Sequence, residues 1–70
     1  MDLIELGKFL KQRRTSLGLS QNTVAEKAGL DRTYISMLER GKKNPTVLTL
    51  YKIGSVLDIK PSQILMEIDL

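Results

Sequence analysis

Residues 29–39, which read GLDRTYISMLE, carry the start and stop signals of one short helix. Gly29 lacks a Cβ atom and can adopt positive φ, so a preceding helix can end there and the chain can change direction. Asp31 is a favourable N-cap, because its carboxylate can accept hydrogen bonds from free N–H groups and its charge suits the positive end of the helix dipole. The stretch therefore predicts a helix over residues 32–40, ended by Gly41.

This helix would have one apolar face and one polar face. Ile35 and Leu38 are spaced i, i+3 and share a face that we expect to be buried. The other side chains offer a cation, two hydroxyls and a thioether: Arg32, Thr33, Ser36 and Met37. These groups can hydrogen-bond base edges or contact a thymine methyl group in DNA. For Met37 the alternative is a partly covered surface residue without such a role.

The composition indicates a small protein that lacks the side chains most often used in catalysis. The 70 residues suit one domain, 1–70, with a core of modest size. The chain has no Cys, which removes disulfides and thiolate chemistry, and no His, the commonest metal ligand and general base. We expect no enzyme activity, no metal and no cofactor. No apolar run approaches the roughly 20 residues of a membrane span and no signal peptide opens the chain, so we expect a cytoplasmic protein without a membrane partner.

Positive charge is concentrated in the middle of the chain. The formal net charge is +3, but residues 8–60 hold all 11 Lys and Arg and only four of the 8 acidic residues, which gives +7. A polyanion would be attracted to this central part and not to the acidic ends. The alternative is a solvated basic surface with no partner.

The rest of the chain also reads as helices, with no alternating pattern that would indicate a strand. We expect a first helix over residues 3–17, a second over 21–28, a fourth that follows the N-cap Thr46 and runs to about Leu57, and a short fifth that begins at Pro61. Proline suits a first helical position because of its fixed φ and missing N–H group.

Two charged residues are in unusual places. Arg13 lies on the apolar face of the first helix, and we expect its stem to follow the edge of the core while its guanidinium reaches water. Glu39 lies in the last turn of its helix, where an acid meets the negative end of the dipole. It therefore needs a cationic partner. Arg14 is the candidate, with Arg13 and Arg40 as alternatives.

Further polar residues are candidates for phosphate contacts. Gln21 and Asn22 lie in the first turn of the second helix, where free N–H groups attract anions. The alternative for Gln21 is an ordinary polar first-turn residue. Tyr34 can donate its hydroxyl to a phosphate or pack at the edge of the core, and both alternatives stay open. The loop over residues 41–45 is basic and cannot remain helical before its proline.

The spacing of these residues matches a known pattern. Counting from Gln21, a small residue at the fifth position, a glycine at the ninth and a β-branched residue at the fifteenth are Ala25, Gly29 and Ile35. With the segments LSQNTVAEKAGLDRTYISMLERGKKNP and LDIKPSQIL, this pattern resembles the Cro and phage-repressor-like family, also called Xre-type regulators. The resemblance covers residues 6–65. Within the family, LDRTYIS followed by LERG and a basic loop is most similar to the controller proteins of restriction-modification systems.

The resemblance implies an all-α, five-helix, lambda-repressor-like fold with its helix-turn-helix over residues 21–40. It also implies a transcriptional regulator that binds a pseudo-palindromic DNA operator as a homodimer. The alternatives are a phage-type repressor, an antitoxin regulator, or a protein-interaction module on the same fold. No domain beyond the core is expected, so no small-molecule ligand is expected either.

The resemblance also implies roles for individual residues. Arg32, Thr33 and Met37 would contact bases, with Ser36 nearby. The phosphates would be held by Gln21, Lys42, Lys43 and Asn44, to which Asn22 and Tyr34 are added by their positions. Arg14 and Glu39 would form a pair. The chain departs from the family at Arg13, where an apolar residue is usual, and at Met37, where many members carry a polar residue.

The C-terminal part, about residues 59–70, has more apolar side chains than a short last helix needs for its own core. We expect Ile64 or Leu65 to face inward and this region to form the dimer interface, through Ile59, Met66 and Ile68. The acidic residues between them would keep this end away from DNA.

Overall fold

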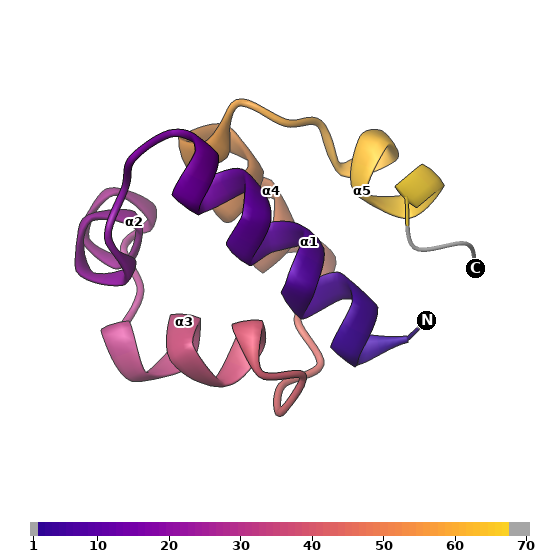
Figure 1. The fold of residues 1–70 in the computed structure, drawn as a ribbon, viewed down its shortest axis with the longest axis horizontal. Helices are drawn as coiled ribbons and strands as arrows, with labels where there is room; N and C mark the ends of the chain where they lie inside the picture. The colour runs from indigo at the N-terminus through magenta and orange to yellow at the C-terminus, as the bar shows by residue number, and fades with distance from the viewer. Residues whose placement is uncertain (1, 68–70) are drawn as a thin grey trace.

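The computed structural model describes residues 2–67 as a set of helices joined by short connections (Figure 1). In chain order they are α1 (Leu3–Ser16), α2 (Gln21–Ala28), α3 (Arg32–Glu39), α4 (Val47–Leu57) and α5 (Pro61–Glu67). No strand occurs among these residues. The expected all-α fold of five helices is therefore confirmed. In the same stretch, no helix has the length and apolar character needed to cross a membrane.

Side chains just before the helices explain where they begin. Asp31 Oδ1 accepts a hydrogen bond from the Thr33 backbone N–H at 2.7 Å, as its position before α3 predicts. The other helices with such a cap are α1, α2 and α4, whose capping residues are Asp2, Ser20 and Thr46. These bonds satisfy N–H groups that have no partner within the helix.

α1 and α3 each end one residue earlier than the sequence pattern indicates. Leu17 and Arg40, which we expected inside these helices, are their C-caps. The glycines that follow, Gly18 and Gly41, have φ of 72° and 74°. A residue in this left-handed conformation turns the chain away from the helix axis, so the regular helix closes before the cap.

The core is one cluster to which every helix contributes. Its members are all buried: Leu6, Leu10, Val24, Ala25, Ala28, Ile35, Leu38, Leu50, Ile53, Leu57 and Ile64. Ile64 is 0% exposed, which confirms one of the two residues expected to face inward from α5. The side chain of the other, Leu65, lies outside the described part of the structure.

Gly7 allows α1 to pack unusually close to the end of α3. A Cβ atom at this position would lie 2.5 Å from the Glu39 carbonyl oxygen and 2.6 Å from that of Leu38. Such contacts are far inside van der Waals distance, and both neighbours are backbone atoms that a side-chain movement cannot relieve. The glycine thereby lets α1 support the last turn of α3 directly.

Arg13 differs from the sequence-based expectation. Its Nε donates to the Leu57 carbonyl oxygen at 2.9 Å, and its Nη2 to the Asp58 carbonyl oxygen at 3.4 Å. The expectation that this guanidinium simply reaches water is therefore wrong. A helix C-terminus leaves carbonyl groups unsatisfied and carries the negative end of the dipole, so the cation of α1 caps α4.

Candidate nucleic-acid interface

α3 lies along one edge of the molecule, where it contacts α1 and α2 (Figure 1). Its inner face is formed by Ile35 and Leu38, which are 2% and 1% exposed. The four side chains expected to contact bases lie outside the core cluster: Arg32 and Thr33 are exposed, and Ser36 and Met37 are half-buried. One short helix thus packs through one face and presents hydrogen-bonding groups on the other.

The connection between α2 and α3 fixes how α3 is presented. Gly29 adopts φ of +69°, and the next residue, Leu30, donates its N–H to the Ala25 carbonyl oxygen at 2.8 Å. The Leu30 side chain also packs against the core. Because the turn is held by both its backbone and its side chain, the first turn of α3 begins at a defined place on the surface.

The basic loop after α3 is anchored at both ends. The Lys42 N–H donates to the Met37 carbonyl oxygen at 2.8 Å, which closes the C-terminal turn of α3. At the other end Pro45 is buried. Between these anchors the residues expected to contact phosphates, Lys42, Lys43 and Asn44, are exposed. The loop therefore holds two cations next to the polar face of α3.

Tyr34 connects this loop to α3. Its half-buried ring packs against the core, in agreement with the core-edge alternative. The Lys43 Nζ atom lies 5.8 Å from the centroid of the same ring, within the range of a cation–π contact. The aromatic ring thus helps to place one loop cation beside the helix.

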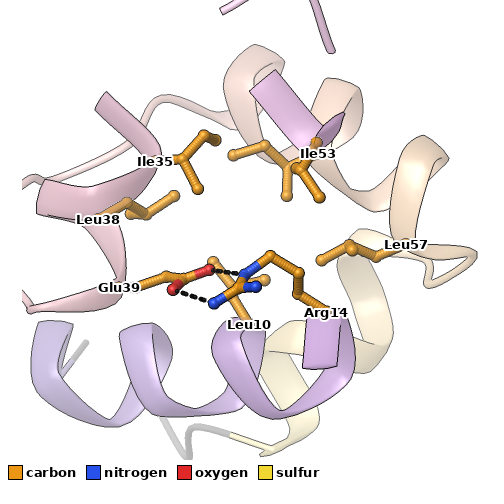
Figure 2. A pocket seen from close by; sticks show the side chains of 8 residues that line it. Leu10, Arg14, Ile35, Leu38, Glu39, Ile53 and Leu57 are labelled. Atoms are coloured by element: carbon orange, nitrogen blue, oxygen red, sulfur yellow. Dashed lines mark hydrogen bonds and ion pairs between the residues drawn. The ribbon is translucent and has the colours of Figure 1, made fainter. Parts of the chain in front are cut away.

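Glu39 has the cationic partner that its position demanded, and the partner is Arg14. The Arg14 Nε donates to Glu39 Oε2 at 2.6 Å and the Nη2 to Oε1 at 3.0 Å, a bidentate arrangement (Figure 2). The two side chains are 10% and 5% exposed. The hydrogen bond to Glu39 raises the pKa of Arg14 above its ordinary value, against the opposing effect of burial. The alternative partners are engaged elsewhere, because Arg13 caps α4 and Arg40 Nε donates to the Ser36 carbonyl oxygen.

The two amides at the start of α2 also donate to carboxylates. Gln21 Nε2 donates to Glu39 Oε1 at 3.0 Å and is half-buried. Asn22 Nδ2 donates to Glu26 Oε1 at 3.1 Å within α2, and it is exposed. The structure thus brings Gln21 to the Arg14 and Glu39 pair and leaves Asn22 on the surface of its own helix.

A small gap in the packing lies behind the Arg14 and Glu39 pair (Figure 2). Besides the pair it is lined by Leu10, Val24, Ile35, Leu38, Ile53 and Leu57, all members of the core cluster. Its volume is about 10 Å³, which is at the lower limit for a single water molecule. It is a feature of core packing and too small for a ligand.

The residues expected at a dimer interface have different surroundings. Met66 on α5 is 82% exposed, whereas Ile59 is half-buried against the core. Ile68 lies outside the described residues. Sequence reasoning missed a second apolar surface at the start of α4, where Val47, Leu48 and Tyr51 are 68%, 64% and 58% exposed. The sequence contains a signal for this surface: at helical spacing, these three apolar residues do not share the face of α4 that carries its buried residues.

Comparisons with known proteins agree with this architecture. Residues 10–64 match the protein family described as Helix-turn-helix. The chain is 36% identical over 70 residues to the uncharacterized HTH-type transcriptional regulator y4dJ of Sinorhizobium fredii, a match that covers 99% of this chain and 91% of that protein.

Two solved structures are similar as well. One is the restriction-modification controller protein C.AhdI from Aeromonas hydrophila, with a TM-score of 0.87, 41% identity, and coverage of 90% of this chain and 96% of that chain. The other is SinR, a master regulator for biofilm formation, in complex with DNA. Its TM-score is 0.81 and its identity 38%, with coverage of 86% of this chain and 97% of that chain.

Proposed function

This chain belongs to the helix-turn-helix family of Xre-type, DNA-binding transcription regulators, and we propose that it binds a pseudo-palindromic operator as a homodimer. The observation that carries the proposal is the division of α3 into a buried face and a face bearing Arg32 and its polar neighbours. An α-helix with its side chains is about 10–12 Å across, and the DNA major groove, about 12 Å wide, can therefore admit α3.

We further propose that the operator controls a restriction-modification system. The similarity to C.AhdI in sequence and fold supports this narrower role. Selection of duplexes from a random library tests the DNA-binding proposal. We expect enrichment of a pseudo-palindrome whose half-sites lie about 34 Å apart, one helical turn of DNA. If no sequence is enriched, the result contradicts the DNA-binding proposal. Restriction endonuclease and methyltransferase genes beside the gene of this protein would identify the regulated system.

The first prediction concerns Arg32. If its guanidinium contacts the O6 and N7 atoms of a guanine, Arg32→Ala should weaken binding to the selected duplex by about 1–3 kcal/mol and relax the preference at one base pair. Affinities for all single base-pair variants of the duplex measure this. Arg32→Lys is the matched control, because it keeps the charge and loses the bidentate geometry. Equal weakening on every sequence would make Arg32 a phosphate contact.

The second prediction concerns Lys43. As a phosphate contact it should leave base preference unchanged, and Lys43→Ala should reduce the slope of log affinity against log salt by about one unit. Affinity at several salt concentrations measures this slope. Lys60→Ala is the control. Lys60 lies in the connection between α4 and α5, and this connection is on the opposite side of the molecule from α3 (Figure 1). A changed base preference, or an equal effect of the control, would contradict the assignment.

The third prediction concerns dimerisation. One recognition helix reads too few base pairs to select a site in a genome, and two-fold symmetry doubles the site. The exposed Met66 supports an interface in the C-terminal part, as the sequence predicts, and the apolar start of α4 offers a second surface. We expect the wild type to sediment as a dimer at micromolar concentration and Met66→Asp to shift it to monomer. Tyr51→Asp tests the α4 surface in the same way. A monomeric wild type would contradict the homodimer, and a dimeric Met66→Asp would place its interface elsewhere.

A further inference from the structure

Glu39 receives hydrogen bonds from two different helices, although its side chain is only 5% exposed. Arg14 donates to it from α1 and Gln21 donates to it from the first residue of α2. We propose that Glu39 is a positioning residue for DNA binding, whose carboxylate orients the Gln21 amide so that a second N–H group is available to a backbone phosphate. This inference rests on the proposed DNA-binding function.

The argument begins with the chemistry of the amide. A glutamine side chain has two N–H donors and one carbonyl acceptor, and rotation by half a turn exchanges them. An ionised carboxylate only accepts, so Glu39 selects the orientation in which Gln21 Nε2 faces it, at 3.0 Å. Within residues 2–67 as described, the second N–H on the same nitrogen has no hydrogen-bond partner. Without Glu39 the amide could also present its carbonyl oxygen, which a phosphate repels.

Arg14 makes this arrangement compatible with DNA. A lone carboxylate next to a phosphate site would repel the phosphate, but the bidentate contact of Arg14 compensates the charge of Glu39. Arg14 Nη1 also donates to the Leu19 carbonyl oxygen at 2.8 Å, in the connection that leads into α2. The same guanidinium therefore fixes both the orienting carboxylate and the backbone that precedes Gln21.

The location of the network supports this role. It joins the first residue of α2 to the last residue of α3, so that it relates the N-terminal end of one helix to the helix that carries the base contacts. Helix N-terminal N–H groups favour anions, and an oriented glutamine N–H adds a donor at the same end. A side chain that is already ordered also loses less conformational entropy when it binds.

A double-mutant cycle on DNA binding tests the proposal. The probe is the duplex that the wild type selects from a random library. Gln21→Ala should weaken binding about tenfold, as expected for a lost hydrogen bond to a charged group. In a background with Arg14→Met and Glu39→Met, which replaces the ion pair with apolar side chains, the same change should have less than a twofold effect. A tenfold effect of Gln21→Ala in both backgrounds would show that Glu39 does not act through Gln21.

A second background covers the case in which the double variant fails to fold. In Glu39→Gln the residue at position 39 both donates and accepts and no longer selects one orientation of Gln21, so Gln21→Ala should have a smaller effect there than in the wild type, and an undiminished tenfold effect would overturn the proposal. The side-chain amide resonances of Gln21 provide a readout that stability alone does not change. The amide proton that faces the carboxylate should lie further downfield in the wild type than in Glu39→Gln, and the same shifts in both proteins would contradict the contact. A wild type that selects no duplex would instead contradict the proposed function.

Discussion

Replacing Glu39 with alanine should lower the free energy of unfolding by about 3–5 kcal/mol, because the charge of Arg14 is then buried without compensation. The Arg14 side chain is 10% exposed and would keep only its hydrogen bond to the Leu19 carbonyl oxygen. For a chain of this length the whole stability is on the order of 4–10 kcal/mol. The change therefore removes a large part of it, and Arg14→Met should act similarly on the remaining carboxylate.

Removing both charges should cost less than removing either one. Arg14→Met combined with Glu39→Met replaces the pair with apolar side chains next to Leu10 and Leu57, which line the same gap. Such replacements of buried ion pairs are often neutral or stabilising. Urea unfolding of the wild type, both single variants and the double variant measures the four free energies. If the single effects simply add, the two groups do not interact.

The pKa of Arg14 defines the pH range in which these experiments are comparable. Its folded-state pKa lies above its ordinary value because of the hydrogen bond to Glu39, so its contribution is fully present below the unfolded pKa and is lost only as the pH rises through the folded pKa. Across the neutral range the contribution of Arg14 to the free energy of unfolding is therefore constant. Unfolding measured at pH 7 and at pH 9 should give the same difference between wild type and the double variant Arg14→Met, Glu39→Met, which has neither charged group.

The features that the sequence predicts well depend on neighbouring residues. Asp31 caps α3 through a bond to a residue two positions away, and Gly29 turns the chain within one residue. Both signals are complete within a few positions. The pairing of Glu39 with Arg14, 25 positions away, is an exception: an acid at the negative end of a helix dipole needs a cation, and the family resemblance implies this partner.

The features that the sequence does not predict depend on residues far apart in the chain. Arg13 caps α4 through the Leu57 carbonyl oxygen, 44 positions away, and no local spacing indicates that contact. Glycine has a low helix propensity, so the sequence gives no reason for Gly7 within α1. The reason is the close contact with the carbonyl groups at the end of α3. The bond from Gln21 to Glu39 likewise requires the final arrangement of α2 and α3. These contacts follow from the packing, which periodicity describes only as a buried face.

Replacing Ile35 with alanine should lower the free energy of unfolding by about 2–5 kcal/mol while leaving the sequence preference of the folded protein intact. Ile35 is 2% exposed and packs within the core cluster, so the smaller side chain leaves a cavity beneath α3. The proposed base contacts lie on the other face of the helix. Thermal or urea unfolding measures the loss, and binding to base-pair variants well below the melting temperature measures the preference.

Thr33→Ala is the matched control for Ile35→Ala, because it removes an exposed side chain from the same helix. Surface changes of this kind usually alter stability by less than about 0.5 kcal/mol, so its effect should appear in DNA affinity and not in unfolding. The two variants then separate the packing face of α3 from its proposed binding face. A changed base preference of folded Ile35→Ala would contradict this separation, because it would mean that α3 moves when the Ile35 side chain is shortened. The position of α3 would then depend on this one side chain more than on the turn at Gly29 and the contact at Gly7.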